Sequence, residues 1–331
     1  MFSEGMADPD GKVERFVGRH SRFVCRDVPL AQYTTFDIGG PAELLVEIDS
    51  IADLVAVVED CRNVGIPTTI FGGGSNVLVS DKGIAGLVVI NRCRQIGQNP
   101  RGVAAEAGAR LSDLIDFAIE NGWGGLEELA GIPGTVGGAI IGNAGAYGRS
   151  ISGNLSKVTI LNGAGLQVEQ GSDELAFGYR TSRLKSTTDI VLRADFTLVP
   201  AAKEQLRRRA DEIVGLRAVK LPVGEKCAGS YFKNIEDPAA PQGKLSAGKL
   251  LEEAGAKSFR VGSAAVSEKH ANVIVNQGGA KAVDVLLLAQ KMKSAVKAKF
   301  GIELSEEVCF LGIPVGGEAG SDGAKKDKAV K

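Results

Sequence analysis

The sequence predicts an α+β protein with more than one domain. Apolar stretches typical of strands alternate with segments of helical periodicity along most of the 331 residues. A chain of this length holds two or three domains, each able to bury a core. After Pro200 the pattern changes to a long charged helix, roughly Lys203 to Ala218, with few residues to bury. We expect this helix to lead into another domain.

The first third of the chain predicts a strand, a helix and then further strands. Residues 43–48 form the first strand. Ser50 and Asp53 match a helix N-cap with an acidic N3 residue, and apolar residues at helical spacing follow. Gly65 and Pro67 end that helix. Short apolar runs predict further strands at 68–71, 77–79 and 86–90.

The remaining elements follow the same rules. Leu111 to Ile119 predicts a helix that ends at Gly122, and Gly301 ends a long C-terminal helix. The predicted helices beyond the charged one span 246–254 and 282–300, and the predicted strands span 157–161, 190–198, 261–266, 272–275 and 308–311.

The expected domain boundaries follow from these changes in composition. Residues 1–20 and 315–331 are polar and rich in glycine or charge, so we expect both tails to be disordered. Between the tails we expect two subdomains and a C-terminal domain, at 21–92, 93–200 and 201–314.

Composition excludes several classes of function. The net charge of −1 argues against a nucleic-acid surface, and no apolar run is long enough to cross a bilayer. The N-terminus lacks the features of a signal peptide. Five cysteines without a C-x-x-C pair indicate a reducing cytoplasm, and two histidines argue against a metal site. We therefore expect a cytoplasmic protein without a metal, acting as a monomer on a small molecule.

Two glycine-rich segments are the most informative local feature. The first is Gly72 to Asn76, inside Phe71–Val79, and the second is Pro133 to Tyr147. Glycine lets backbone N–H groups approach an anion closely, and serine, threonine and asparagine add polar donors. Neither segment matches a Rossmann fingerprint or a P-loop. Each alone is also consistent with a tight turn, but together they favour a large phosphorylated cofactor.

Three polar clusters contain candidate chemistry. Arg180 lies in a glycine-containing turn and offers a planar fork for a carboxylate or phosphate, although a structural ion pair is an equal alternative. Ser230 lies among small residues without a nearby histidine, which favours a proton donor over a nucleophile if it is not simply a buried turn serine. Glu306 and Glu307 precede the last strand, and Glu306 reads as a solvated residue. The sequence does not decide between a structural and a functional His270.

These clusters, in this order, resemble the UDP-N-acetylenolpyruvoylglucosamine reductase family. The similarity extends from about residue 20 to residue 313. The matching segments are 34–42, 72–76, 133–147, 178–180, 229–234, 267–272 and 307–308.

The resemblance implies the fold and the reaction. It implies a two-subdomain FAD-binding unit of the vanillyl-alcohol-oxidase type, followed by a C-terminal α+β substrate-binding domain. Members reduce non-covalent FAD with NADPH. The reduced flavin then delivers hydride to the enolpyruvyl ether of UDP-N-acetylglucosamine, which yields UDP-N-acetylmuramate for peptidoglycan. Such a flavoprotein serves cell wall biogenesis, cell shape and cell division.

The resemblance also assigns roles to residues. Arg180, Ser230 and Glu307 match the catalytic residues, with Ser230 as general acid and the other two at the substrate carboxylate. Tyr179, Asn234 and His270 match substrate contacts. The implied FAD contacts are Gly72, Gly73, Gly74, Ser75, Asn76, Pro133, Gly134, Thr135, Gly137, Gly138, Asn143, Gly145, Ala146 and Tyr147.

Some features depart from the family pattern. Ile235 replaces a common proline, and the segment from Arg217 to Pro222 differs, so we assign no role to Arg217 or Lys220. The short interval between Arg180 and Ser230 is similar to the subclass without a lid loop. The alternatives are an FAD-dependent sugar or alcohol oxidase with the same flavin domain, and a non-catalytic flavin- or nucleotide-sugar-binding module.

Overall fold

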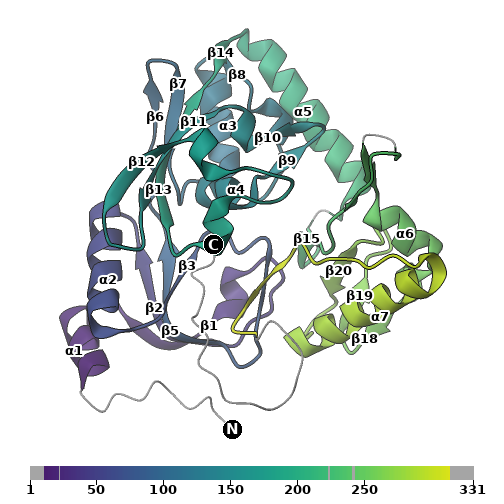
Figure 1. Ribbon diagram of the computed structural model, residues 1–331, viewed down its shortest axis with the longest axis horizontal. Coiled ribbons are helices and arrows are strands. Elements are labelled where there is room, and N and C mark those ends of the chain that lie inside the picture. Colours follow the sequence, from purple (N-terminus) through teal and green to yellow (C-terminus); the bar gives the residue numbers. More distant parts are fainter. Residues whose placement is uncertain (1–10, 22, 223, 241–242, 314–331) are drawn as a thin grey trace.

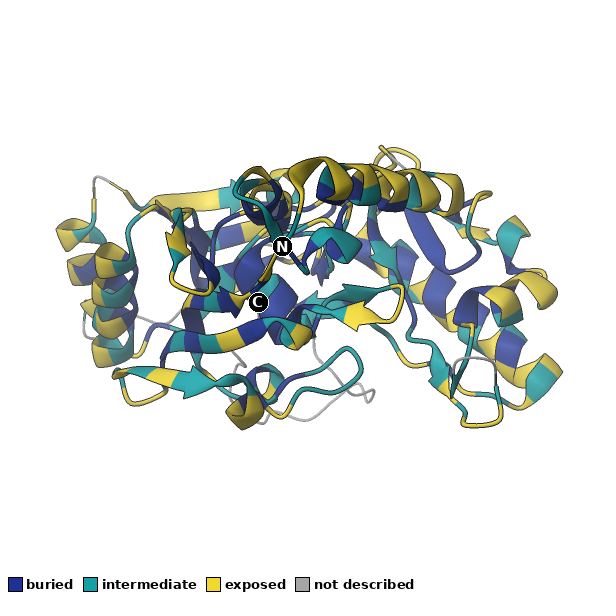
Figure 2. Cartoon of the chain, turned by 90° about the horizontal axis from the view of Figure 1, so that it is seen from above, coloured by how far each residue is buried: buried dark blue, intermediate teal, exposed yellow. Residues whose placement is uncertain are grey.

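The computed structural model describes residues 11–21, 23–222, 224–240 and 243–313. The chain forms three packed units, which we call the first (residues 11–94), second (95–220) and third (226–308) unit. In Figure 1 the first lies at the lower left, the second at the top and the third at the right. In each unit the helices turn buried residues inward and exposed residues outward (Figure 2).

The first unit is built on a four-stranded mixed sheet in the order β1-β2-β5-β3. Helix α2 (Ile51–Val64) covers it, and Ser50 caps that helix by accepting a hydrogen bond from the Asp53 N–H. Gly65 ends α2 with a φ of 76°, a left-handed conformation that favours glycine. The strands are β1 (Cys25–Pro29), β2 (Pro41–Ile48), β3 (Thr68–Phe71) and β5 (Ile84–Asn91), and β4 (Val77–Val79) lies apart from this sheet.

The expectation of a disordered N-terminal tail is wrong for its described part. Residues Lys12–Arg19 form helix α1, which packs on α2. Phe16 is fully buried in the core of the first unit, with Val13 and Val17 packed beside it. This apolar face stabilises the helix. Residues 1–10 and 315–331 lie outside the described residues.

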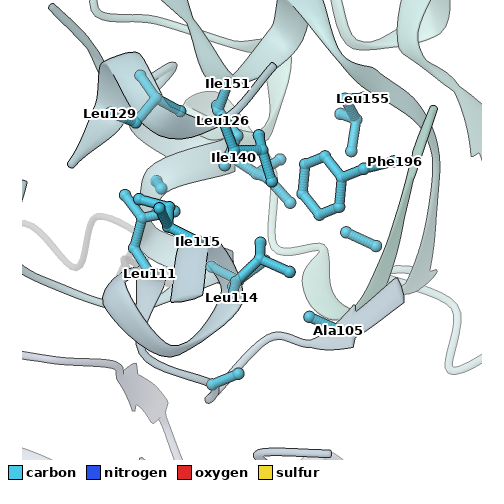
Figure 3. Close-up of a cluster of buried hydrophobic side chains, with 14 of the residues drawn as sticks. Ala105, Leu111, Leu114, Ile115, Leu126, Leu129, Ile140, Ile151, Leu155 and Phe196 are labelled. Carbon is cyan, nitrogen blue, oxygen red and sulfur yellow. The ribbon is translucent and has the colours of Figure 1, made fainter. Parts of the chain in front are cut away.

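The second unit is a five-stranded antiparallel sheet in the order β12-β11-β13-β7-β6, covered by helices. Figure 3 shows Phe196 of the sheet among side chains of α3 (Leu111–Glu120) and Ile140 of α4 (Val136–Gly142). Its large strands are β6 (Ile96–Asn99), β7 (Gly102–Glu106), β11 (Leu155–Leu161), β12 (Gln167–Gly171) and β13 (Ile190–Thr197), and its short ones β8 (Trp123–Gly124), β9 (Gly145–Ala146), β10 (Arg149–Ser150) and β14 (Val199–Pro200).

The charged helix α5 (Lys203–Lys220) belongs by packing to the second unit. Leu206, Ala210 and Ile213 are buried in the core of that unit. Arg207 forms ion pairs with acidic residues of α3. Arg209 forms ion pairs with Glu128, in the 3₁₀ turn Glu127–Leu129 that follows α3, and with Glu212 of α5 itself. The boundary was expected at residue 200, but α5, which follows that residue, still packs on the core of the second unit.

The third unit is a four-stranded antiparallel sheet in the order β15-β20-β19-β18, packed against two helices. The strand expected at 261–266 is instead a hairpin, because Gly262 turns the chain at a φ of 53°. The elements are β15 (Cys227–Ser230), β16 (Ile235–Glu236), β17 (Lys244–Leu245), α6 (Ala247–Glu253), β18 (Arg260–Val261), β19 (Ala264–Val266), β20 (Val273–Asn276) and α7 (Ala282–Phe300).

The first and third units are joined by a shared strand pair and by side chains of the first unit in the core of the third. The last strand, β21 (Cys309–Leu311), returns to the first unit and pairs in parallel with β4 (Figure 1). Phe36, Ile38 and Leu78 of the first unit are buried in the core of the third. The carboxylate of Asp81 accepts hydrogen bonds from the first backbone N–H groups of α7, at 2.7 and 3.1 Å. These contacts fix the first and third units against each other.

Candidate active site

The two glycine segments lie directly against each other. A Cβ on Gly72 would lie 2.4 Å from Thr135 Oγ1, and one on Gly73 would lie 2.9 Å from Gly134 Cα. Both contacts are too short for a side chain. The Ser75 hydroxyl also donates to the Pro133 carbonyl at 3.2 Å. Glycine is therefore required here for the close approach of one segment to the other.

The second glycine segment is not a loop throughout. Residues 136–142 form α4, and the Thr135 hydroxyl caps it by accepting from the Gly138 N–H. The Gly137 N–H donates to the Ala107 carbonyl at 2.9 Å. These two amides are already hydrogen-bonded within the protein, and the assignment of Gly137 and Gly138 to the cofactor stays a prediction. Within the described part of the chain, the backbone N–H groups of Gly72–Asn76 make no hydrogen bond.

Two adjoining cavities meet at Gly72, Thr135 and Gly138. The smaller is mainly apolar, with Asn91, Thr135 and Asp189 as polar groups. The larger is lined by both glycine segments and by polar residues of all three units. The free amides of the first segment suit the phosphates of a dinucleotide, and the polar lining of the larger cavity suits a charged ligand. The residues present therefore fit the expected FAD.

Arg180 lines the larger cavity, and its backbone is held in a rare conformation. Its φ of 55° places a non-glycine residue in the left-handed region, a strain typical of functional sites. The Asn143 side-chain amide donates to the Gly178 carbonyl at 2.9 Å, and Lys185 donates to the Arg180 carbonyl. The Arg180 guanidinium donates to the Gly145 carbonyl at 2.9 Å. Asn143 and Gly145, expected at the cofactor, thus also position Arg180.

Glu307 lies beside Arg180 in the lining of the larger cavity. Its Oε1 is 2.6 Å from Arg180 Nε, an ionic contact without good hydrogen-bond alignment. The Asn76 side chain donates to the Glu307 carbonyl at 3.2 Å, which attaches the acid to the first glycine segment. Burial raises the pKa of Glu307 above its ordinary value, although Arg180, Lys185 and Lys233 oppose this. The neutral acid is therefore easier to form here than in water.

Ser230 is the last residue of β15 and lines the same cavity. Its hydroxyl makes no hydrogen bond within the described residues, so it is available to a ligand. Arg180, Ser230 and Glu307 come from three distant segments and share one cavity, as the sequence predicted.

The other expected substrate residues lie outside the linings of these two cavities. Tyr179 lies beside Asn234, and the Lys244 ammonium lies 3.3 Å from the centre of its ring. The Asn234 Oδ1 accepts from the Ala247 N–H at the start of α6. His270 packs against Gly248 of the same helix. Their assignment as substrate contacts stays a prediction.

Tyr147, expected at the cofactor, lies in the turn between β9 and β10. It has a φ of 50° and is 43% exposed. Ala146 pairs with Arg149 across that turn. Together with Asn143 and Arg180, Tyr147 is a third left-handed non-glycine residue near the cavity. Such strain is maintained only where surrounding contacts require it.

Arg217 is a cavity residue to which the sequence assigned no role. It comes from the last turn of α5 and lines the larger cavity with Arg180. Its Nε is buried and has no hydrogen-bond partner among the described residues, and burial lowers the pKa of Arg217. A guanidinium in this state favours an anionic ligand. The only signal in the sequence was a basic residue thirteen positions before Ser230.

None of the helices formed by the described residues has the length and hydropathy that a bilayer-spanning segment requires.

Comparison with known proteins gives a consistent result. A family model described as "FAD binding domain" matches residues 42–170, and one described as "UDP-N-acetylenolpyruvoylglucosamine reductase, C-terminal domain" matches 221–311. The reductase of that name from Heliobacterium modesticaldum is 42% identical, covering 86% of this chain and 89% of the relative. The one from Carboxydothermus hydrogenoformans is 40% identical, covering 90% and 97%.

A solved structure extends the similarity to three dimensions. It is the crystal structure of UDP-N-acetylenolpyruvylglucosamine reductase from Thermus caldophilus. It superimposes with a TM-score of 0.73 at 34% identity, covering 87% of this chain and all of the other. The predicted combination of an FAD-binding part and a C-terminal α+β part is confirmed.

Proposed function

This chain belongs to the UDP-N-acetylenolpyruvoylglucosamine reductase family, and we propose that its larger cavity is where the family's reaction takes place. The chain is an FAD-dependent oxidoreductase of peptidoglycan precursor synthesis. It uses NADPH to reduce the enolpyruvyl ether of UDP-N-acetylglucosamine-enolpyruvate to UDP-N-acetylmuramate. The observation that carries the proposal is the convergence of Arg180, Ser230 and Glu307 on this cavity.

The two glycine segments are proposed to hold FAD, with the free amides of Gly72–Asn76 at its diphosphate. The larger cavity, which contains the candidate catalytic residues, is the proposed place of the redox ring. When bound, FAD accepts hydride from NADPH and supplies it to the substrate.

Arg180 and Glu307 are proposed to bind the carboxylate of the enolpyruvyl group. Addition of hydride to one carbon of the double bond places negative charge on the other carbon and its carboxylate. The guanidinium stabilises that charge, and a protonated Glu307 donates a hydrogen bond to it. Arg217 adds a second positive charge to the same cavity. Ser230 then donates its hydroxyl proton to the second carbon as general acid.

The function is tested by following flavin absorbance anaerobically. The purified protein should be yellow, NADPH should bleach it, and the enolpyruvyl sugar should restore the colour. Failure of the sugar to restore it, with rapid oxygen consumption in the presence of simple sugars or alcohols, would support the oxidase alternative. The comparisons do not favour that alternative.

The rate of substrate reduction is expected to fall as the pH rises through the pKa of Glu307, which lies above the ordinary carboxyl value. The protonated acid is the hydrogen-bond donor, so ionisation removes the donor and places a negative charge beside the developing one. A bound substrate carboxylate raises this pKa further. The measurement is the pH profile of kcat/KM for the enolpyruvyl sugar. Glu307→Gln should be slower but should lack this fall, and an unchanged profile in the variant would assign the fall to another group.

Gly73→Ala is expected to weaken FAD binding about tenfold or more. Its Cβ would lie 2.9 Å from Gly134 Cα and force the two segments apart, and overpacking of this kind costs about 1–3 kcal/mol. The Kd for FAD is measured by fluorescence quenching on apoprotein. Gly97→Ala is the matched control, since its Cβ would meet no atom of the described residues within 4 Å. Equal FAD affinity in the two variants would contradict the proposed binding site.

The compartment and the oligomeric state in which the enzyme acts are also proposed. All five cysteines are free thiols, which supports a reducing cytoplasm. We expect the enzyme to act there as a monomer on a nucleotide sugar, which size-exclusion chromatography with light scattering would test.

A further inference from the structure

The buried side chain of Asn272 holds one edge of the chain beside Ser230. The Phe232 N–H donates to Asn272 Oδ1 at 2.9 Å, and Asn272 Nδ2 donates to the Phe232 carbonyl at 2.8 Å. The Asn272 carbonyl also accepts from the Tyr231 N–H at 2.8 Å. The side-chain amide thus pairs with Phe232 as a neighbouring strand would. Asn272 is 3% exposed, so water cannot replace these bonds.

Ser230 needs such support because its strand is irregular. The pairing of β15 with β20 shifts register between Cys227 and Ser230, and Gly229 has a φ of 73°. A bulge of this kind re-aims the side chain that follows it. Regular pairing with β20 reaches only Ser230 opposite Val273. Beyond it the chain is held on that side by Asn272 and on the other side by backbone pairing with Ser305 to Glu307. The direction of the Ser230 hydroxyl therefore depends on this amide.

The residues that Asn272 holds are also bonded to Glu307. The Tyr231 carbonyl accepts a hydrogen bond from the Glu307 N–H at 2.8 Å. Tyr231 consequently links the Asn272 carbonyl on one side to the Glu307 backbone on the other. A shift of residues 231–232 would displace Ser230 and Glu307 together.

His270 in turn fixes Asn272. The Asn272 N–H donates to His270 Nδ1 at 3.1 Å, and the Val273 N–H donates to the His270 carbonyl at 3.0 Å. The ring is confined by Gly248, where a Cβ would lie 2.8 Å from His270 Cε1. An unprotonated Nδ1 is required, and burial favours it by lowering the pKa of His270. The pair forms a compact turn ahead of β20.

We infer that Asn272, oriented by His270, is a positioning residue that aims the Ser230 hydroxyl at the substrate carbon and fixes its distance from Glu307. The inference rests on the proposed function and deepens it. It gives His270 a task that does not depend on contact with substrate.

Asn272→Asp tests the inference. The variant keeps the acceptor for the Phe232 N–H but places an oxygen against the Phe232 carbonyl. Reoxidation of reduced flavin by the enolpyruvyl sugar should slow by about 10²-fold, the size expected for a misplacement of about 1 Å. Flavin reduction by NADPH, the Kd for FAD and the Kd for the sugar should stay within about twofold. The solvent deuterium isotope effect on reoxidation should increase, because proton donation becomes slower.

Asn276→Asp is the matched control. Asn276 is equally buried, and its amide donates to the carbonyls of Phe36 and Asp37, away from Ser230. It should lose stability to urea like Asn272→Asp but keep the reoxidation rate. Equal slowing in both variants, or equal slowing of both half-reactions in Asn272→Asp, would overturn the inference. A wild-type protein that the sugar cannot reoxidise would overturn the proposed function instead.

Variants of His270 provide a second test that does not require a buried charge. Asn at this position places Oδ1 where Nδ1 lies and still accepts the N–H two residues on, as in an Asx turn. His270→Asn should retain reoxidation within about threefold, whereas His270→Leu should slow it about tenfold or more with the sugar Kd unchanged. Equal rates in the two variants would overturn the role given to His270. Loss confined to sugar affinity in both would identify a substrate contact instead.

Discussion

Replacing Ser230 with alanine is expected to slow the second half-reaction by about 10²–10⁴-fold, the usual loss when a general acid is removed. The hydroxyl lines the cavity with Arg180 and Glu307, and within the described residues no protein group hydrogen-bonds to it. Flavin reduction by NADPH requires no proton from this serine and should remain nearly intact. Stopped-flow absorbance of the flavin, with NADPH and the enolpyruvyl sugar in separate mixes, measures both rates.

Ser263→Ala is the control for this experiment, because Ser263 lies in the turn between β18 and β19 and lines neither cavity. It should leave both half-reactions unchanged. If Ser230→Ala slowed the two half-reactions equally, Ser230 would be a residue of the binding site and not the proton donor.

Arg180→Lys is expected to reduce turnover by about 10²–10³-fold, comparable with the loss of one group that stabilises transition-state charge. The guanidinium contacts Glu307 through Nε and the Gly145 carbonyl through another nitrogen, at 2.6 and 2.9 Å. An ammonium is a single point and cannot keep both contacts while binding a carboxylate. The measurement is kcat and KM for the enolpyruvyl sugar, together with the Kd for FAD.

Arg209→Lys serves as the matched substitution on the surface of α5. Arg209 pairs with Glu128 and Glu212 in a part-buried position and lines neither cavity. Its turnover should equal that of the unmodified enzyme. Near-normal turnover in Arg180→Lys would remove Arg180 from the mechanism.

The elements predicted correctly are those with strong local signals. Ser50, Gly65 and Gly301 mark helix ends by side-chain capping or by a left-handed conformation, both of which are local. The C-terminal helix from Ala282 to Phe300 was predicted with the bounds observed. Strands such as β6 and β12 were missed, because their polar residues show no apolar run and their pairing partners are distant in sequence.

The second glycine segment shows how packing overrides propensity. Glycine is a poor helix former, so Gly137, Gly138 and Gly142 predicted a loop. In the structure Thr135 caps a helix there, and its apolar residues Val136, Ile140 and Ile141 are buried in the second core. Burial of this face outweighs the cost of the glycines.

For the candidate site, the sequence predicted residue types but not their mutual support. Arg180, Ser230 and Glu307 were identified by motif, and their convergence required the second and third units to fold against each other. Arg217 was left without a role because a basic residue in a charged helix has no distinctive pattern. Asn76 and Asn272 bind the chain beside the catalytic candidates. The sequence does not reveal these contacts, because the partners lie 231 and 40 residues apart.

The pairing of β21 with β4 has a consequence for biosynthesis. Asn76 leaves the ribosome long before Glu307, its partner 231 positions later. At about 5–20 residues per second, this interval lasts roughly 10–50 s. During it Leu78, which is fully buried in the finished protein, has neither its neighbouring strand nor the core it joins. The nascent chain therefore has an incomplete cofactor site and an exposed apolar surface around Leu78 until translation is almost complete. Premature termination yields an inactive fragment that chaperones or proteases must remove.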